Sequence, residues 1–85
     1  MKLYYKVTPD VYRSCLEQIR EKFAMHEEVD EAHTILLLDD ESQIERVIGT
    51  FDPNTDDMAQ VRVTLVDESL RGFFDSVLGA PYKVR

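Results

Sequence analysis

The spacing Asp52-x-Asn54-x-Asp56 is the pattern in this chain that comes closest to a metal site. Alternating oxygen ligands of this kind open the calcium-binding loops, in which carboxylate and backbone oxygens surround one hard cation. The match ends there, because the sixth position is Asp57 instead of glycine and the twelfth is Val63 instead of glutamate. We therefore interpret the segment as a turn rich in Asp, Asn and Pro, and we expect neither a metal nor a cofactor.

Histidine, cysteine and serine are the remaining residue types that could bind a transition metal or act as nucleophiles. His26 and His33 have four acids between them, but no second cysteine or third histidine completes a tetrahedral zinc site. Cys15 falls in the apolar stripe of a predicted helix, where a cysteine is typically buried and unreactive. Ser42 could be drawn into a triad with His33, yet the chain has no G-x-S-x-G motif. We expect a protein that is not an enzyme. A metal-dependent enzyme is the third alternative and requires a bound ion.

Composition narrows the functional classes further. The 85 residues include 10 Lys and Arg against 17 Asp and Glu, a net charge of −7 at pH 7. This balance argues against direct binding of nucleic acid or of a membrane surface, both of which use a basic face. Tyr4 between Lys2 and Lys6 is the only approach to an aromatic and basic nucleic-acid site. No apolar run reaches membrane length, no signal sequence opens the chain and one cysteine fits a reducing compartment, so we expect a cytoplasmic protein.

Hydrophobic periodicity predicts the strands. Alternation and apolar runs predict strands over residues 2–7, 33–38 and 61–66. The run Ile35–Leu38 is apolar at every position, which is typical of a central strand covered on both faces. Segment 43–51 is ambiguous, because Ser42 and Glu45 form a capping box for a short helix while its β-branched residues favour a strand. We predict a hairpin between 33–38 and 43–51 and keep the helix as the alternative.

Apolar stripes at helical spacing predict two helices. The first begins at Thr8-Pro9, a hydroxyl cap followed by proline, and runs to about residue 26. The second is capped by Asp67 and ends before Gly79. Gly72 lies inside it, which suggests close packing or a bend at that point. The order is β-α-β-β-β-α with a short final strand allowed at 82–85. We predict a single α+β domain over residues 1–85, an antiparallel sheet of about four strands with two helices packed on one face.

The acids are concentrated in the middle of the chain. Residues 27–57 contain eleven acids and one arginine, a net charge of −10, whereas residues 1–26 carry +2 and residues 58–85 carry +1. If 33–38 pairs with 43–51, the connections 27–32 and 52–58 emerge at the same end of the sheet. That end would then gather seven acids, which are Glu27, Glu28, Asp30, Glu31, Asp52, Asp56 and Asp57.

This charge pattern predicts a non-catalytic interaction or regulatory protein that docks on a basic surface of another macromolecule, because opposite charges steer association. The seven acids are the expected partner-binding residues. The plainest alternative is that loop acids only keep the protein soluble. Another alternative is a small ligand-binding or regulatory domain that homodimerises through its sheet, since Ile35–Leu38, Tyr4 and the tail Tyr82–Val84 leave apolar surface to cover.

Overall fold

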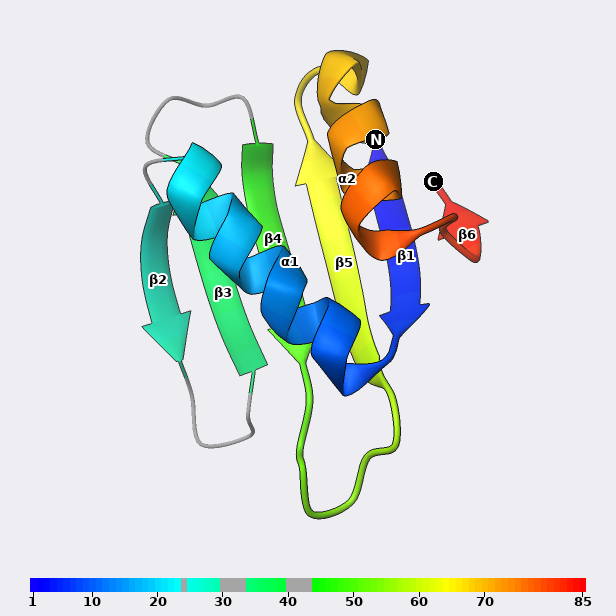
Figure 1. The fold of residues 1–85 in the computed structure, drawn as a ribbon. Coiled ribbons are helices and arrows are strands. Elements are labelled where there is room, and N and C mark those ends of the chain that lie inside the picture. The colour runs from blue at the N-terminus through cyan, green and yellow to red at the C-terminus, as the bar shows by residue number, and fades with distance from the viewer. Residues whose placement is uncertain (24, 30–33, 40–43) are drawn as a thin grey trace.

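The computed structural model describes the backbone of residues 1–23, 25–29, 34–39 and 44–85, and the side chains of residues 1–23 and 44–85. The chain alternates strands and helices in the order drawn in Figure 1. The elements are β1 (Lys2–Val7), α1 (Pro9–Lys22), β2 (Met25–Val29), β3 (Thr34–Asp39), β4 (Ile44–Thr50), β5 (Ala59–Leu65), the 3-10 helix η1 (Glu68–Leu70), α2 (Arg71–Leu78) and β6 (Lys83–Val84).

The strands form one sheet in the order β2-β3-β4-β5-β1-β6, and every neighbouring pair is antiparallel. Strands β2 to β5 follow one another as a meander, whereas β1 inserts between β5 and β6 (Figure 1). The two ends of the chain consequently lie side by side. The Lys2 N–H donates to the Arg85 carbonyl at 2.6 Å, and the Arg85 N–H donates to the Lys2 carbonyl at 2.8 Å.

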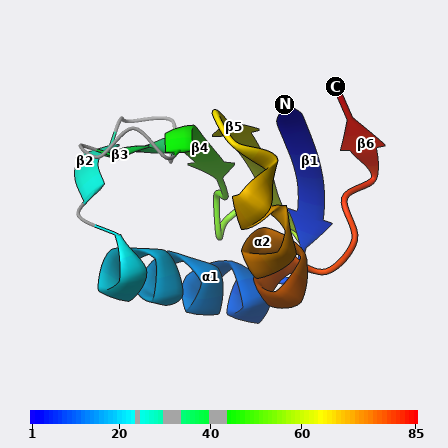
Figure 2. The same cartoon turned by 90° about the horizontal axis from the view of Figure 1, so that it is seen from above.

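Helices α1 and α2 lie on the same face of the sheet, and none of the described helices covers the other face (Figure 2). The core lies between these two layers. Its sheet side comes from alternate residues of β1, β4 and β5, and its helix side comes from the apolar stripes of α1 and α2. The α+β class, the antiparallel sheet and the placement of the helices are confirmed, and so is the short final strand. The core residues are Leu3, Tyr5, Val7, Tyr12, Cys15, Leu16, Ile19, Ile44, Val47, Ala59, Val61, Val63, Leu65, Phe74 and Leu78.

The first helix is shorter than predicted. It begins as expected, with the Thr8 side chain accepting a hydrogen bond from the Val11 N–H at 3.4 Å. It ends at Lys22, because Phe23 turns to extended backbone while its N–H still donates to the Ile19 carbonyl at 2.9 Å. The chain then forms β2, an edge strand paired with β3. The prediction of a helix to residue 26 was therefore wrong, since strand pairing overrides the weak local preference of the sequence Met-His-Glu-Glu-Val.

The ambiguous segment 43–51 contains strand β4, and its hairpin with β3 is confirmed by the pairing of Thr34 with Thr50 and of Leu37 with Val47. Ser42, the first member of the alternative capping box, lies outside the described residues.

Gly49 in β4 allows the first helix to pack closely on the sheet. A Cβ at Gly49 would lie 2.5 Å from Tyr12 Oη, so only glycine lets that ring pack directly on the strand.

The second helical region starts and stops as the sequence predicts. The Asp67 side chain accepts from the Ser69 N–H at 3.0 Å, and Gly79 ends α2 with φ of 81°, a left-handed conformation that favours glycine. Close packing at Gly72 was not found, because nothing lies within 4 Å of the position its Cβ would take. This glycine is the second residue of α2 and is exposed.

Candidate interaction surfaces

Three surfaces of the described structure carry side chains that could bind a partner. They are the loop between β4 and β5, the groove between the two helices, and the face of the sheet that the helices leave uncovered. We name them the acidic loop (residues 51–58), the helix groove and the open face.

The acidic loop is held by its own side chains. Asp52 Oδ1 accepts from the Asn54 N–H at 2.9 Å, and Asp56 Oδ2 accepts from the Asp52 N–H at 2.9 Å. The Asp56 N–H also donates to the Asp52 carbonyl at 2.8 Å. These bonds form the Asp- and Asn-rich turn that the sequence predicts. Asp57 is exposed and makes no hydrogen bond or ion pair with another described residue.

The remaining predicted partner-binding residues belong to β2 and its connection to β3. Glu27 and Glu28 lie within β2, so they are strand residues and not the loop residues we expected. Asp30 and Glu31 lie outside the described residues. The pairing of Thr34 with Thr50 places the start of β3 beside the end of β4, where the acidic loop begins. The strand ends therefore meet at one end of the sheet, while the gathering of all seven acids remains a prediction.

The acidic loop and the two histidines are the parts of the sequence that could suggest a metal site. Within the acidic loop, the carboxylates of Asp52 and Asp56 accept hydrogen bonds from backbone N–H groups of the loop itself. Among the described residues, no group of three or more His, Cys, Asp or Glu side chains is placed to hold an ion. His26 lies in β2 and not at a helix end, and His33 lies outside the described residues.

Cys15 and Tyr5 are two buried titratable side chains of the core. Cys15 is only 1% exposed, and burial raises the pKa of its thiol to about 12. The thiolate needed for nucleophilic attack is therefore strongly disfavoured. Tyr5 donates a hydrogen bond from its hydroxyl to Asp75 Oδ1 at 2.9 Å, which ties β1 to α2. Burial, together with this carboxylate, raises the pKa of the Tyr5 hydroxyl above its usual range.

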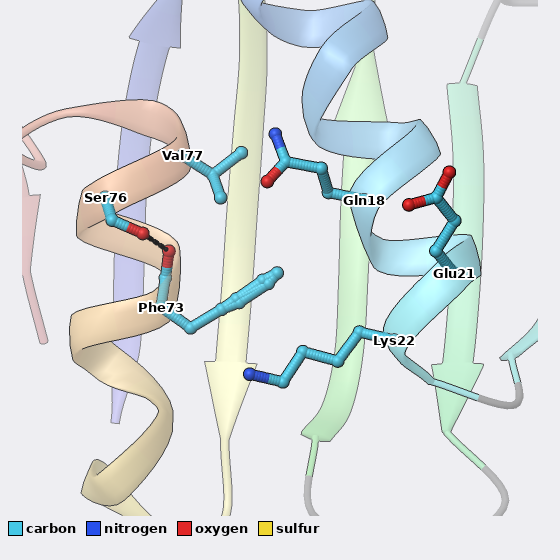
Figure 3. Close-up of a pocket in the computed structure, with 6 residues that line it drawn as sticks. All are labelled: Gln18, Glu21, Lys22, Phe73, Ser76 and Val77. Carbon is cyan, nitrogen blue, oxygen red and sulfur yellow. Dashed lines mark hydrogen bonds between the residues drawn. The ribbon is translucent and has the colours of Figure 1, made fainter.

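The helix groove is a hollow of about 510 Å³ between α1 and α2 (Figure 3). Phe73 lines the hollow and stacks on Phe23 with ring centroids 5.6 Å apart. The Lys22 ammonium lies 4.4 Å from the Phe73 ring centroid, within cation–π range. Ser76 donates its hydroxyl to the Phe73 carbonyl at 2.7 Å and so is not paired with a base. The lining residues of the groove are Gln18, Glu21, Lys22, Phe73, Ser76 and Val77.

The open face is basic and aromatic. Strand register places its side chains in three rows, which are Lys2–Thr64–Arg46, Lys83–Tyr4–Arg62–Ile48 and Lys6–Gln60–Thr50. A hollow of about 230 Å³ lies among Tyr4, Ile48, Arg62 and Tyr82. The Tyr4 and Tyr82 rings are 6.3 Å apart, and the Lys83 ammonium lies 5.5 Å from the Tyr4 ring centroid.

Arg62 is the unusual residue of this face. Its Nε atom is buried and has no hydrogen-bond partner within the described part of the chain. A buried guanidinium N–H without an acceptor costs free energy. Sequence reasoning singled out Lys2, Tyr4 and Lys6 but missed Arg62. The alternation Val61-Arg62-Val63 was the available signal, because it places an arginine on the face opposite the core.

Comparison with protein-family models, with curated proteins and with solved structures gave no match to this chain. No described helix is long and apolar enough to cross a membrane.

Proposed function

We propose that this protein is a non-catalytic interaction or regulatory protein that docks on a basic surface of another macromolecule through its acidic end. The observation that carries the proposal is the acidic loop, which projects at one end of the sheet (Figure 1) and contains three acids without a lysine or arginine. The residues assigned to docking are Glu27, Glu28, Asp30, Glu31, Asp52, Asp56 and Asp57.

In the proposed mechanism, two of the loop acids stabilise the turn and the third contacts the partner. Asp52 and Asp56 use carboxylate oxygens to hold the turn, so a partner meets a loop that is already ordered. Asp57 is free to pair with a lysine or arginine of the partner. Exposed charges of one sign also raise the association rate with a basic surface, and this effect weakens as salt screens the field.

Affinity capture from a lysate of the source cells tests this proposal, with the intact chain as bait at low and then high salt. We expect a basic protein to be recovered at low salt and lost at high salt. A triple variant, Asp30→Asn, Glu31→Gln and Asp57→Asn, removes three charges but leaves the turn-forming carboxylates in place. This variant should lose the partner.

The matched control removes the same charge from the helical side of the molecule, through Asp10→Asn, Glu17→Gln and Glu68→Gln, all exposed positions. It should retain the partner that the loop variant loses. Equal recovery by the wild type and the loop variant would contradict the proposal, and so would equal loss by both variants.

A further inference from the structure

The open face is the second large feature that calls for a partner, because the sheet has one covered and one uncovered side. Strand β3 lies inside the sheet and carries the apolar run Ile35–Leu38, a pattern typical of strands covered on both faces. The helices cover only one face (Figure 2). On the open face, Leu36 of β3 pairs with Ile48 of β4, and Ile48 is only partly buried.

Charge is segregated across the same sheet. One half of the open face, formed by β5, β1 and β6, carries the basic residues Lys2, Lys6, Arg62 and Lys83. Strand β2 forms the opposite edge of the sheet and contains no lysine or arginine. Its Glu28 is in register with open-face residues, whereas Glu27 pairs with Leu37, which pairs with the core residue Val47 and so belongs to the helix-covered face. Strand register connects the two edges in one row, which is Lys83–Tyr4–Arg62–Ile48–Leu36–Glu28. The row runs from basic through apolar to acidic.

We propose that a second copy of this chain covers the open face, and that the twofold axis of the dimer runs parallel to the strands. A rotation of 180° about such an axis reverses the strand order of the second copy. Strand β2 of each copy then faces the basic half of its partner, and the apolar middle of each row faces the apolar middle of the other. The surface is self-complementary, as a twofold interface requires.

The other in-plane axis, perpendicular to the strands, gives the opposite electrostatics. It places β2 against β2 and the basic half against the basic half, so like charges meet on both sides. The first arrangement instead places Glu28 of each copy opposite Lys83 of the other, so unlike charges meet at both edges.

The area of the open face determines how strongly the two copies are expected to bind each other. Five strands about 4.8 Å apart, with about six residues each at 3.3 Å, span about 24 Å by 20 Å. Two such faces bury about 1,000 Å² in total, near the lower end for a specific interface. We therefore expect a dissociation constant in the micromolar range. The dimer shares Glu28 with the residues assigned to docking but leaves the acidic loop exposed. The triple loop variant and the open-face variants therefore test the two proposals separately.

Sedimentation velocity over a concentration series from low micromolar to sub-millimolar is the primary test. The wild type should pass from monomer to dimer without larger species. Ile48→Lys places a cation opposite Arg62 of the second copy and should weaken the dimer at least 10-fold. Its circular dichroism should match that of the wild type, so that a folding defect is recognised. A wild type that stays monomeric at every concentration would overturn the proposal.

Charge reversal tests the orientation of the axis. Lys2→Glu with Lys83→Glu should weaken the dimer at least 10-fold, and so should Glu28→Lys. Combining Lys83→Glu with Glu28→Lys exchanges the signs of one facing pair and should restore the dimer. Strengthening of the dimer by either charge reversal alone would refute this axis. The control pair Arg13→Glu and Lys22→Glu, on the helical side, should leave the dimer unchanged.

The same variants also test whether the open face binds single-stranded nucleic acid instead of a second copy of the chain. We would titrate the wild type with a short fluorescein-labelled oligothymidylate and follow anisotropy at low salt. No binding is expected, because the net charge of −7 repels a polyanion. A monomer that binds this oligonucleotide, and loses binding on Lys2→Glu with Lys83→Glu, would overturn the dimer and assign the face to single-stranded nucleic acid.

Discussion

The acidic loop and the open face differ in how they are built. The loop is local, because the bonds that shape it join residues no more than four apart in the chain. The open face is non-local, since one of its rows brings Lys83, Tyr4 and Arg62 together across the sheet. A local surface can be altered without disturbing the rest of the fold, whereas a non-local surface lasts only as long as strand pairing does. Substitutions in the two regions should therefore differ in how much they change the free energy of unfolding and in how far from the substituted residue the structure is disturbed.

Loss of the shared core should affect both regions together and should have the largest effect. Phe74 is 0% exposed and packs beneath the sheet. Phe74→Ala should lower the free energy of unfolding by about 3–5 kcal/mol, through lost transfer free energy and the cavity left behind. Urea denaturation followed by circular dichroism measures this. A loss below about 1 kcal/mol would mean that α2 is not part of the core on which both regions rest.

A larger residue at position 49 of β4 should disturb the open face more than the acidic loop. Gly49→Ala introduces a Cβ 2.5 Å from Tyr12 Oη, so the ring or the strand must shift. We expect a loss of about 1–3 kcal/mol in the free energy of unfolding, as for overpacked cores. Chemical denaturation gives the value. The double variant Gly49→Ala with Tyr12→Leu should recover part of the loss, and no recovery would show that the strain comes from elsewhere.

The hydrogen bond between Tyr5 of β1 and Asp75 of α2 should give the stability of the fold a pH dependence. Because the pKa of Tyr5 is raised in the folded state, the folded protein holds this proton more tightly than the unfolded chain. Stability from this group is complete below the unfolded pKa of about 10 and falls as the pH rises above it. Tyr5→Phe should lower the free energy of unfolding by about 1 kcal/mol at pH 7. It should also flatten the alkaline decline, which denaturation at several pH values measures. An unchanged alkaline decline in the variant would contradict this assignment.

Within the loop, the carboxylates should differ from one another. Asp52→Ala removes the acceptor of the Asn54 N–H and should cost about 1 kcal/mol in the free energy of unfolding. Asp57→Ala removes no described bond and should change the free energy of unfolding by less than about 0.5 kcal/mol. Thermal denaturation of the two variants side by side measures the difference. Equal losses would indicate that Asp57 also takes part in the turn.

The smallest effect should come from a site in neither region. Gly72 is exposed in the first turn of α2, and a methyl group there meets nothing within 4 Å. Gly72→Ala should raise the free energy of unfolding by about 0.5 kcal/mol, because it restricts the unfolded chain and favours the helix. It should leave both partner capture and dimerisation unchanged. Destabilisation would show that the glycine has a role outside its described contacts.

The contrast between local and non-local surfaces also explains what could be predicted from sequence. The turn at Asp52–Asp57 and the stripes of both helices are patterns of neighbouring residues, and each is confirmed. Strand β2 was missed, because its Glu27-Glu28 pair gives no alternation and only pairing with β3 makes it a strand. The basic half of the open face was missed for the same reason. Arg62 and Lys83 become neighbours of Tyr4 only through the register of β1.

The insertion of β1 between β5 and β6 bears on the order of events during folding. The meander from β2 to β5 joins strands that follow one another, so each pairing closes only a short loop. Pairing β1 with β5 joins Lys2 to Thr64 and must close a loop that contains α1 and three strands. Closing long loops costs more chain entropy and slows folding in proteins rich in such contacts. Docking of β1 is therefore expected to limit the folding rate, and shortening that loop should speed folding.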